Sequence, residues 1–123
     1  MARLRTGAAV RAATIKAAYT MKIVRNAEVM WREEDEARAQ AYEGLSRGDD
    51  VSEVGTSILF SDGVMLSLNL LGTEIWKICD GKSIDRIVSE LLPHFDADPD
   101  VLKKDTIRFI AELAQKGFIR YEE

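Results

Sequence analysis

The spacing of the apolar residues changes at Asn69, and this change constrains the fold more than any other feature of the chain. Residues 56–69 alternate apolar and polar positions around Ser61-Asp62-Gly63, which is typical of a β-hairpin with a tight turn. Gly63 can adopt the positive φ that such a turn requires. After Asn69, apolar residues recur every three or four positions, which predicts helices. The sequence therefore predicts an α+β fold in which the strands precede the helices.

Three helices are expected after the hairpin, each preceded by a polar residue whose side chain can cap the first turn. The cap residues are Asn69, Ser83 and Asp98, and the ends are marked by Gly81, Pro93 and Gly117. Residues 28–32 alternate in the same way as the hairpin and predict one earlier strand. The expected architecture is winged-helix-like, with a three-stranded antiparallel sheet followed by three helices. Residues 118–121 are expected to fold back as a packed tail.

The segment between the first strand and the hairpin, residues 33–54, is an acidic insertion. Residues 28–54 contain nine acidic and only three basic side chains. Ala37, Ala41 and Leu45 recur every four residues, which suggests a short amphipathic helix ending near Gly48. A solvated acidic insertion without a dedicated binding role is the simpler interpretation.

The N-terminal residues differ in charge from the rest of the chain. Six basic and no acidic residues precede Asn26, whereas the remainder has 11 basic and 21 acidic residues. We expect residues 1–21 to form a basic extension, disordered or helical; alternatively, Met21 is the natural start and residues 1–20 are upstream sequence. Residues 22–123 are expected to form one domain. Its acidic balance argues against binding to a phosphate backbone.

The inventory of reactive side chains argues against an enzyme. His94 is the single histidine and Cys79 the single cysteine, so this chain alone cannot assemble a histidine relay, an imidazole-rich or four-ligand zinc site, or an iron–sulfur cluster. We therefore predict no catalytic residue, no metal and no cofactor. Cys79 lies on an apolar helix stripe, where a small core residue is expected. One cysteine and no apolar stretch long enough to span a membrane favour a cytoplasmic protein without a membrane partner.

The return strand of the hairpin is unusual because residues 64–69 contain no charge, no Pro and no Gly. Edge strands usually carry such residues, which prevent pairing with another chain. Two interpretations follow: either the third helix or the C-terminal tail covers this edge, or it is open to a partner that adds a strand. On the third helix, Leu102, Thr106, Phe109 and Leu113 form the expected core stripe. Ile107, Ile110 and Ala114 widen it, to pack on the tail or to face a partner.

The chain resembles the PqqD family. The resemblance is carried by Gly72-Thr73-Glu74-Ile75-Trp76-Lys77-Ile78-Cys79-Asp80-Gly81, by Asp105, Phe109, Leu113 and Lys116-Gly117-Phe118, and by Trp31 and Asp62-Gly63. It implies a peptide chaperone, the RiPP recognition element, which binds the leader of a ribosomally made precursor peptide as an added strand. Such a protein delivers the leader to a radical S-adenosylmethionine maturase, often one with a SPASM domain. Because residues 33–54 replace the short first turn of the family, we expect a relative that serves a pathway other than pyrroloquinoline quinone synthesis.

The resemblance also implies a peptide-binding site on one strand and one helix. Carried onto this chain, the site comprises Val64, Met65, Leu66, Ser67 and Leu68 on the strand, with Lys103, Ile107 and Ile110 on the third helix. The choice of helix residues rests on the helical wheel.

Two other functions fit the same pattern. A winged-helix DNA-binding regulator has similar helix spacing, but residues 82–123 contain seven basic and nine acidic side chains, which does not favour contact with nucleic acid. A homodimer could pair the open strand with its own copy.

Overall fold

The computed structural model describes residues 21–123, so the predicted N-terminal extension lies, apart from Met21, outside the described residues. The described residues form two compact units. Residues 26–78 make up one unit. Residues 79–123, together with the first strand, make up the other.

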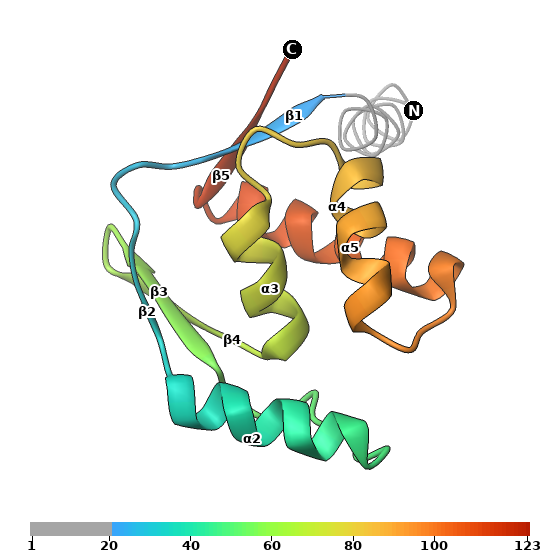
Figure 1. The fold of residues 1–123 in the computed structure, drawn as a ribbon. Helices are drawn as coiled ribbons and strands as arrows, with labels where there is room; N and C mark the ends of the chain where they lie inside the picture. The colour runs from blue at the N-terminus through green and yellow to red at the C-terminus, as the bar shows by residue number, and fades with distance from the viewer. Residues whose placement is uncertain (1–20) are drawn as a thin grey trace, which may run out of the picture. The chain divides into compact units, whose positions relative to one another are not determined.

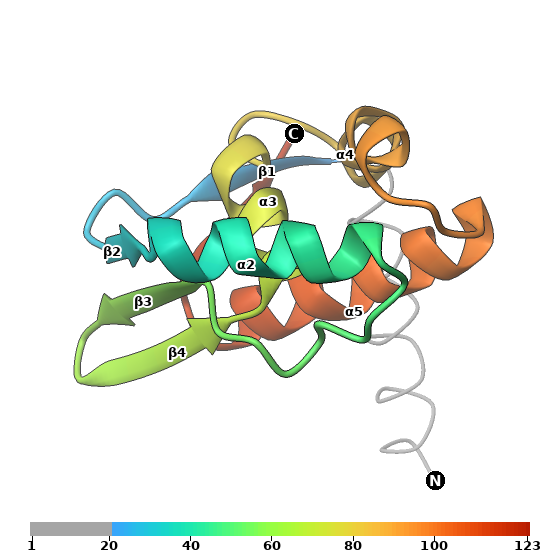
Figure 2. The ribbon, with the colours of Figure 1, turned by 60° about the horizontal axis from the view of Figure 1, so that its bottom comes forward.

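A three-stranded antiparallel sheet forms the centre of the unit at residues 26–78 (Figures 1 and 2). It contains β2 (Met30–Glu33), β3 (Ser57–Ser61) and β4 (Val64–Leu68), with β3 in the middle. Asp62 and Gly63 connect β3 to β4, and both have positive φ, 51° and 78°. This is the type I′ turn whose twist matches that of the flanking strands. The predicted hairpin and first strand are therefore confirmed.

Two helices complete this unit. The acidic insertion forms α2 (Asp35–Ser46), which confirms the short helix expected there, and Ala41 and Gly44 are its buried residues. Helix α3 (Leu70–Ile78) follows β4 directly, and the Asn69 side chain accepts a hydrogen bond from the Gly72 N–H at 2.9 Å. This is the cap predicted from the sequence.

The other unit contains a two-stranded sheet that the sequence did not reveal. Strand β1 (Lys22–Arg25) pairs antiparallel with β5 (Ile119–Glu122), side by side in Figure 1. The Ile23 N–H also donates to the Lys82 C=O at 2.8 Å. Strands of four residues whose partners lie at opposite ends of the chain leave little local pattern, which explains why the C-terminal residues were expected only to pack as a tail.

The helices of this unit are α4 (Ile84–Leu91), a short 3₁₀ turn η1 (Leu92–His94) and α5 (Pro99–Gln115). Ser83 caps α4 and Asp98 caps α5, with Pro99 in the first turn, as expected. The buried stripe of α5 consists of Leu102, Thr106, Ile110 and Leu113.

The helical wheel misassigned two residues of α5. It placed Phe109 in the core and Ile110 on the flank, whereas Ile110 is fully buried and Phe109 is half-buried. The two positions are adjacent, about 100° apart around a helix, so a modest rotation of the helix about its axis exchanges their roles.

The predicted fold class is confirmed: the chain is α+β, with a three-stranded antiparallel sheet that precedes α3, α4 and α5. Within the described residues, helix α2 in the insertion is additional to these three. None of the helices in residues 21–123 has the length and apolar character needed to cross a membrane.

Candidate functional site

The orientation of the backbone in β4 follows from the register of the hairpin. Ser61 pairs with Val64 across the two-residue turn, and the Leu68 C=O accepts from the Thr56 N–H at 2.8 Å. Backbone groups alternate in direction along an antiparallel strand. Val64, Leu66 and Leu68 therefore direct their N–H and C=O groups toward β3. Met65 and Ser67 direct theirs toward the open edge.

The sheet has two edges, and they differ in charge. Strand β2 ends at the charged residues Arg32 and Glu33, and Glu34 follows them. The five residues of β4 carry no charge. Within residues 21–123, β4 pairs only with β3, and the C-terminal tail, one of the expected covers for this edge, pairs with β1 instead. The strand therefore keeps an edge without the charges that usually discourage pairing.

Exposed apolar side chains gather at the end of this sheet that carries the β3–β4 turn. Of the six large hydrophobic residues that are exposed within residues 21–123, five lie here: Met30, Trp31, Phe60, Val64 and Met65. We call these five residues the sheet tip. Met65 is 68 % exposed and Met30 70 % exposed. Such a concentration of exposed apolar surface is typical of an interaction site.

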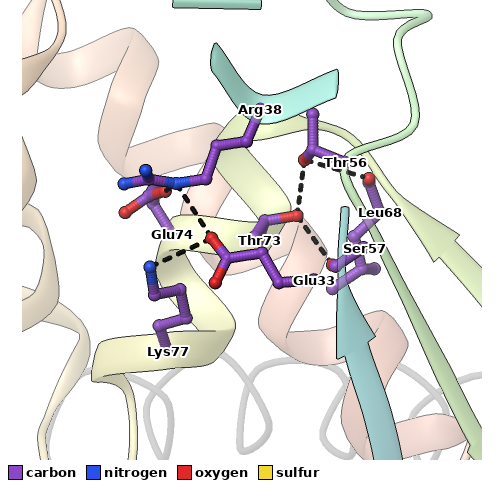
Figure 3. A network of polar contacts seen from close by, with 8 residues as sticks. All are labelled: Glu33, Arg38, Thr56, Ser57, Leu68, Thr73, Glu74 and Lys77. Carbon is purple, nitrogen blue, oxygen red and sulfur yellow. Dashed lines mark hydrogen bonds and ion pairs between the residues drawn. The ribbon is translucent and has the colours of Figure 1, made fainter. Parts of the chain in front are cut away.

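The opposite end of the sheet, which we call the sheet base, is the row formed by Glu33, Ser57 and Leu68 in register. A chain of buried hydroxyl groups fixes it to α3 (Figure 3). The Thr73 Oγ1 lies 2.7 Å from both Thr56 Oγ1 and Ser57 Oγ, and Thr56 Oγ1 donates to the Leu68 C=O at 3.4 Å. Each hydroxyl can act as donor and as acceptor, so the three side chains can form a continuous chain that ends at the Leu68 C=O. Each of these buried hydroxyl groups is therefore hydrogen-bonded, as a stable base requires.

An ion network attaches α2 to the same base (Figure 3). The Arg38 Nε lies 2.9 Å from Glu33 Oε1 and 2.7 Å from Glu74 Oε1, and the Lys77 Nζ lies 3.1 Å from Glu33 Oε1. The Arg38 Nε–H donates a hydrogen bond to the Glu74 carboxylate, and this bond raises the pKa of Arg38, so the guanidinium stays charged. The network joins α2, β2 and α3, and it holds the acidic insertion in place.

The predicted strand residues lie together along β4, but they differ in accessibility. Val64, Met65 and Ser67 are exposed, Leu66 is half-buried, and Leu68 is a core residue with 3 % exposure. Met65 and Ser67 lie on the outer face of the sheet. Val64, Leu66 and Leu68 lie on the inner face, where Trp31 contacts Trp76 of α3 edge to face with ring centroids 6.4 Å apart.

The predicted helix residues all lie on α5, in the other unit. Lys103 pairs with Asp85 of α4 at 3.0 Å, and Ile107 is half-buried. Ile110 is fully buried, so its side chain supports the helix from the core instead of presenting a surface.

The contribution of β2 and β3 to the tip was not predicted from the sequence. Met30, Phe60 and Met65 are direct neighbours in register, on the outer face. A two-residue turn at Asp62-Gly63 already fixes Phe60 opposite Met65, so that part was accessible from sequence. The position of Met30 required the β2 register, which spans the insertion.

The side chains considered for chemistry occupy ordinary positions. Cys79 is fully buried, and desolvation raises the pKa of its thiol to about 12, which keeps it neutral and unreactive. Within residues 21–123, no group of three His, Cys, Asp or Glu side chains is arranged to hold a metal ion.

Fold and edge together define a small α+β module with an uncharged, unpaired strand edge. Comparison with known proteins adds its family: the model for coenzyme PQQ synthesis protein D (PqqD) matches residues 51–119. The chain belongs to the PqqD family.

A solved structure shares the fold. It is the solution NMR structure of the PqqD truncation of Methylobacterium extorquens PqqCD, described as a functional, stand-alone RiPP recognition element. The TM-score is 0.55 at 20 % sequence identity, over 80 % of this chain and 87 % of that one. No curated protein matches the chain.

Proposed function

We propose that this protein is a non-catalytic peptide chaperone. It binds the leader of a ribosomally synthesised precursor peptide as a strand added to β4, and it presents that leader to a radical SAM/SPASM maturase. Membership of the PqqD family supports the general role, and the fold shared with a RiPP recognition element supports the same class of ligand.

The observation that carries the proposal is the second edge of β4, with which no other strand in residues 21–123 pairs. Met65 and Ser67 each turn one N–H and one C=O away from β3, and the strand carries no charge. An extended peptide satisfies these groups through main-chain hydrogen bonds, and its alternate side chains then contact the two faces of the sheet. Main-chain pairing supplies affinity and side-chain contacts supply selectivity.

The helix part of the proposed site rests on the helical wheel, whereas the β4 part rests on strand pairing. On α5 we propose that the peptide contacts Ile107, which is half-buried, and Lys103, whose Nζ also pairs with Asp85. Ile110, which is fully buried, acts only by positioning the helix.

The position of the acidic insertion suggests which partner it meets. Helix α2 carries Asp35 and Glu36 in its first turn and is held by the Arg38 network. We propose that this fixed acidic helix favours a basic leader or a basic patch on the maturase. The test measures how salt affects leader binding and maturase binding in a variant with Asp35→Asn and Glu36→Gln. A loss of salt dependence in either interaction would support the proposal, and unchanged salt dependence in both would contradict it.

Ser67→Pro tests strand addition most cleanly. Proline removes the N–H that faces the open edge, whereas the bonds of β4 to β3 remain because they come from the neighbouring residues. We expect peptides selected from a random display library on the original chain to bind Ser67→Pro at least about tenfold more weakly, a change of roughly 1.4 kcal/mol.

Ser67→Ala is the matched control, since it keeps the N–H, and it should bind normally. Equal affinity of the Pro and Ala variants, with both folded by circular dichroism, contradicts the proposal. A stable dimer that buries β4 and resists peptide contradicts it as well. The same titration with Ile107→Glu tests α5, and unchanged binding by that variant excludes the helix from the site.

A further inference from the structure

The apolar tip extends the peptide site beyond the edge of β4. Met30, Phe60 and Met65 form a continuous row across the outer face of all three strands, because each is the register partner of the next. A shallow hollow of about 290 Å³ lies over this row, and its six lining residues are Met30, Trp31, Arg32, Ile58, Phe60 and Met65. The row ends at the open edge, at the residue whose backbone faces an added strand.

Strand addition fixes what lies next to this row. A residue paired with Met65 places its side chain on the same face as Met65, whichever way the added strand runs. The residue two positions away lies beside Ser67, which is exposed and polar. The captured segment therefore meets one apolar position and one polar position along the outer face.

The opposite edge of the sheet does not offer the same continuation. On β2 the outer-face neighbour of Met30 is Arg32, which pairs with Glu34 at 2.7 Å. A strand added there meets this ion pair, whereas a strand added to β4 meets none. The charge pattern thus favours occupation of the row from the β4 side.

We propose that Met65 and Phe60 set the sequence preference of the captured leader: the leader carries a large apolar residue opposite Met65, and a small or polar residue opposite Ser67. This proposal rests on strand addition at β4 and defines the class of peptide it selects. Met65 makes the direct contact. Phe60 lies one strand further and extends the same apolar surface, and Met30 lies another strand away. Because neighbouring strands are roughly 4.8 Å apart, contact with the leader should weaken from Met65 to Phe60 to Met30.

Large apolar residues are favoured because Met65 is 68 % exposed and Phe60 is 42 % exposed in the free chain. Covering them removes apolar surface from water without any rearrangement of the sheet, and the gain grows with the size of the incoming side chain. A charged residue opposite Met65 would instead lose hydration beside an apolar neighbour.

The test uses peptides selected from a random display library on the original chain. We expect the selected peptides to share one large apolar residue, with a small or polar residue two positions away. Met65→Thr should weaken their binding about fivefold, whereas Met30→Thr, the matched variant on the far strand, should change it less than about twofold. The double variant with Met65→Ser and Ser67→Met exchanges the apolar and the polar position of β4, both of which are exposed. The apolar residue and the small or polar residue should therefore exchange places in the peptides that it selects.

Three outcomes separate the hypotheses. If peptides bind and Ser67→Pro blocks them, but the double variant selects the same pattern as the original chain, the sequence preference is wrong and strand addition stands. If Met30→Thr weakens binding as much as Met65→Thr, a body that covers the whole outer face occupies the row, which overturns the inference. If Ser67→Pro has no effect, the proposed function itself fails.

Discussion

The two ends of the same three-stranded sheet are built in opposite ways. At the base, Ser57 is buried and hydrogen-bonded to Thr73, and Glu33 is held by Arg38 and Lys77. At the tip, five large apolar side chains are exposed. The strands and their register are common to both ends, so the difference lies in the side chains alone. It teaches that the base ties the sheet to its helices, whereas the tip exposes apolar surface beside the unpaired edge of β4, where we propose that a partner binds.

The largest effect on stability is expected at the base, from Thr73→Val. Valine has nearly the shape of threonine but cannot accept the hydrogen bond of Ser57, whose buried hydroxyl then loses its partner. We expect the free energy of unfolding in urea to fall by about 2–3 kcal/mol, with little change in the peptide affinity of the folded protein. Thr73→Ser keeps the hydroxyl and is the control. If Thr73→Val unfolds at the same urea concentration as the original chain, the hydroxyl chain does not stabilise the base.

A smaller loss is expected from Arg38→Met, which keeps most of the packing volume but removes the charge between Glu33 and Glu74. These groups are partly exposed, with side-chain accessibility of 34 %, 20 % and 14 % for Arg38, Glu33 and Glu74, so water weakens the interaction. We expect a loss of about 1 kcal/mol that shrinks as salt is added. Arg32→Met, in an exposed pair with Glu34, should cost less, and an equal cost for both variants would argue against a special role for the network.

The smallest effect on stability belongs to the tip. Met65→Thr should change the free energy of unfolding by no more than about 0.5 kcal/mol, because its side chain lies largely in water. The same substitution is expected to weaken peptide binding. If Met65→Thr lowered the free energy of unfolding as much as Thr73→Val is expected to, the two ends of the sheet would not differ in their contribution to stability.

Local chemistry made much of the fold predictable. The Asp62-Gly63 turn and the caps at Asn69, Ser83 and Asp98 act within a few residues, so the hairpin and the three later helices could be placed from sequence. The pairing of β1 with β5 could not, because its partners are remote and each strand has only four residues.

The candidate site was predictable in part for the same reason. The uncharged β4 edge is visible in the sequence, and the two-residue turn fixes Phe60 beside Met65. Tertiary packing decided the rest. It buried Ile110 where the wheel predicted a flank, and it brought Arg38 of the insertion onto Glu33 and Glu74. No local sequence pattern encodes the burial of Ile110 or the ion pairs of Arg38.

Amide hydrogen exchange measured by NMR, with and without bound peptide, tests strand addition most directly. The Met65 and Ser67 N–H groups face the open edge, so they should exchange rapidly in the free protein and become protected when peptide binds. The Leu66 N–H, which faces β3, should be protected in both states. Saturating peptide that leaves Met65 and Ser67 exchanging as fast as before would contradict pairing at β4.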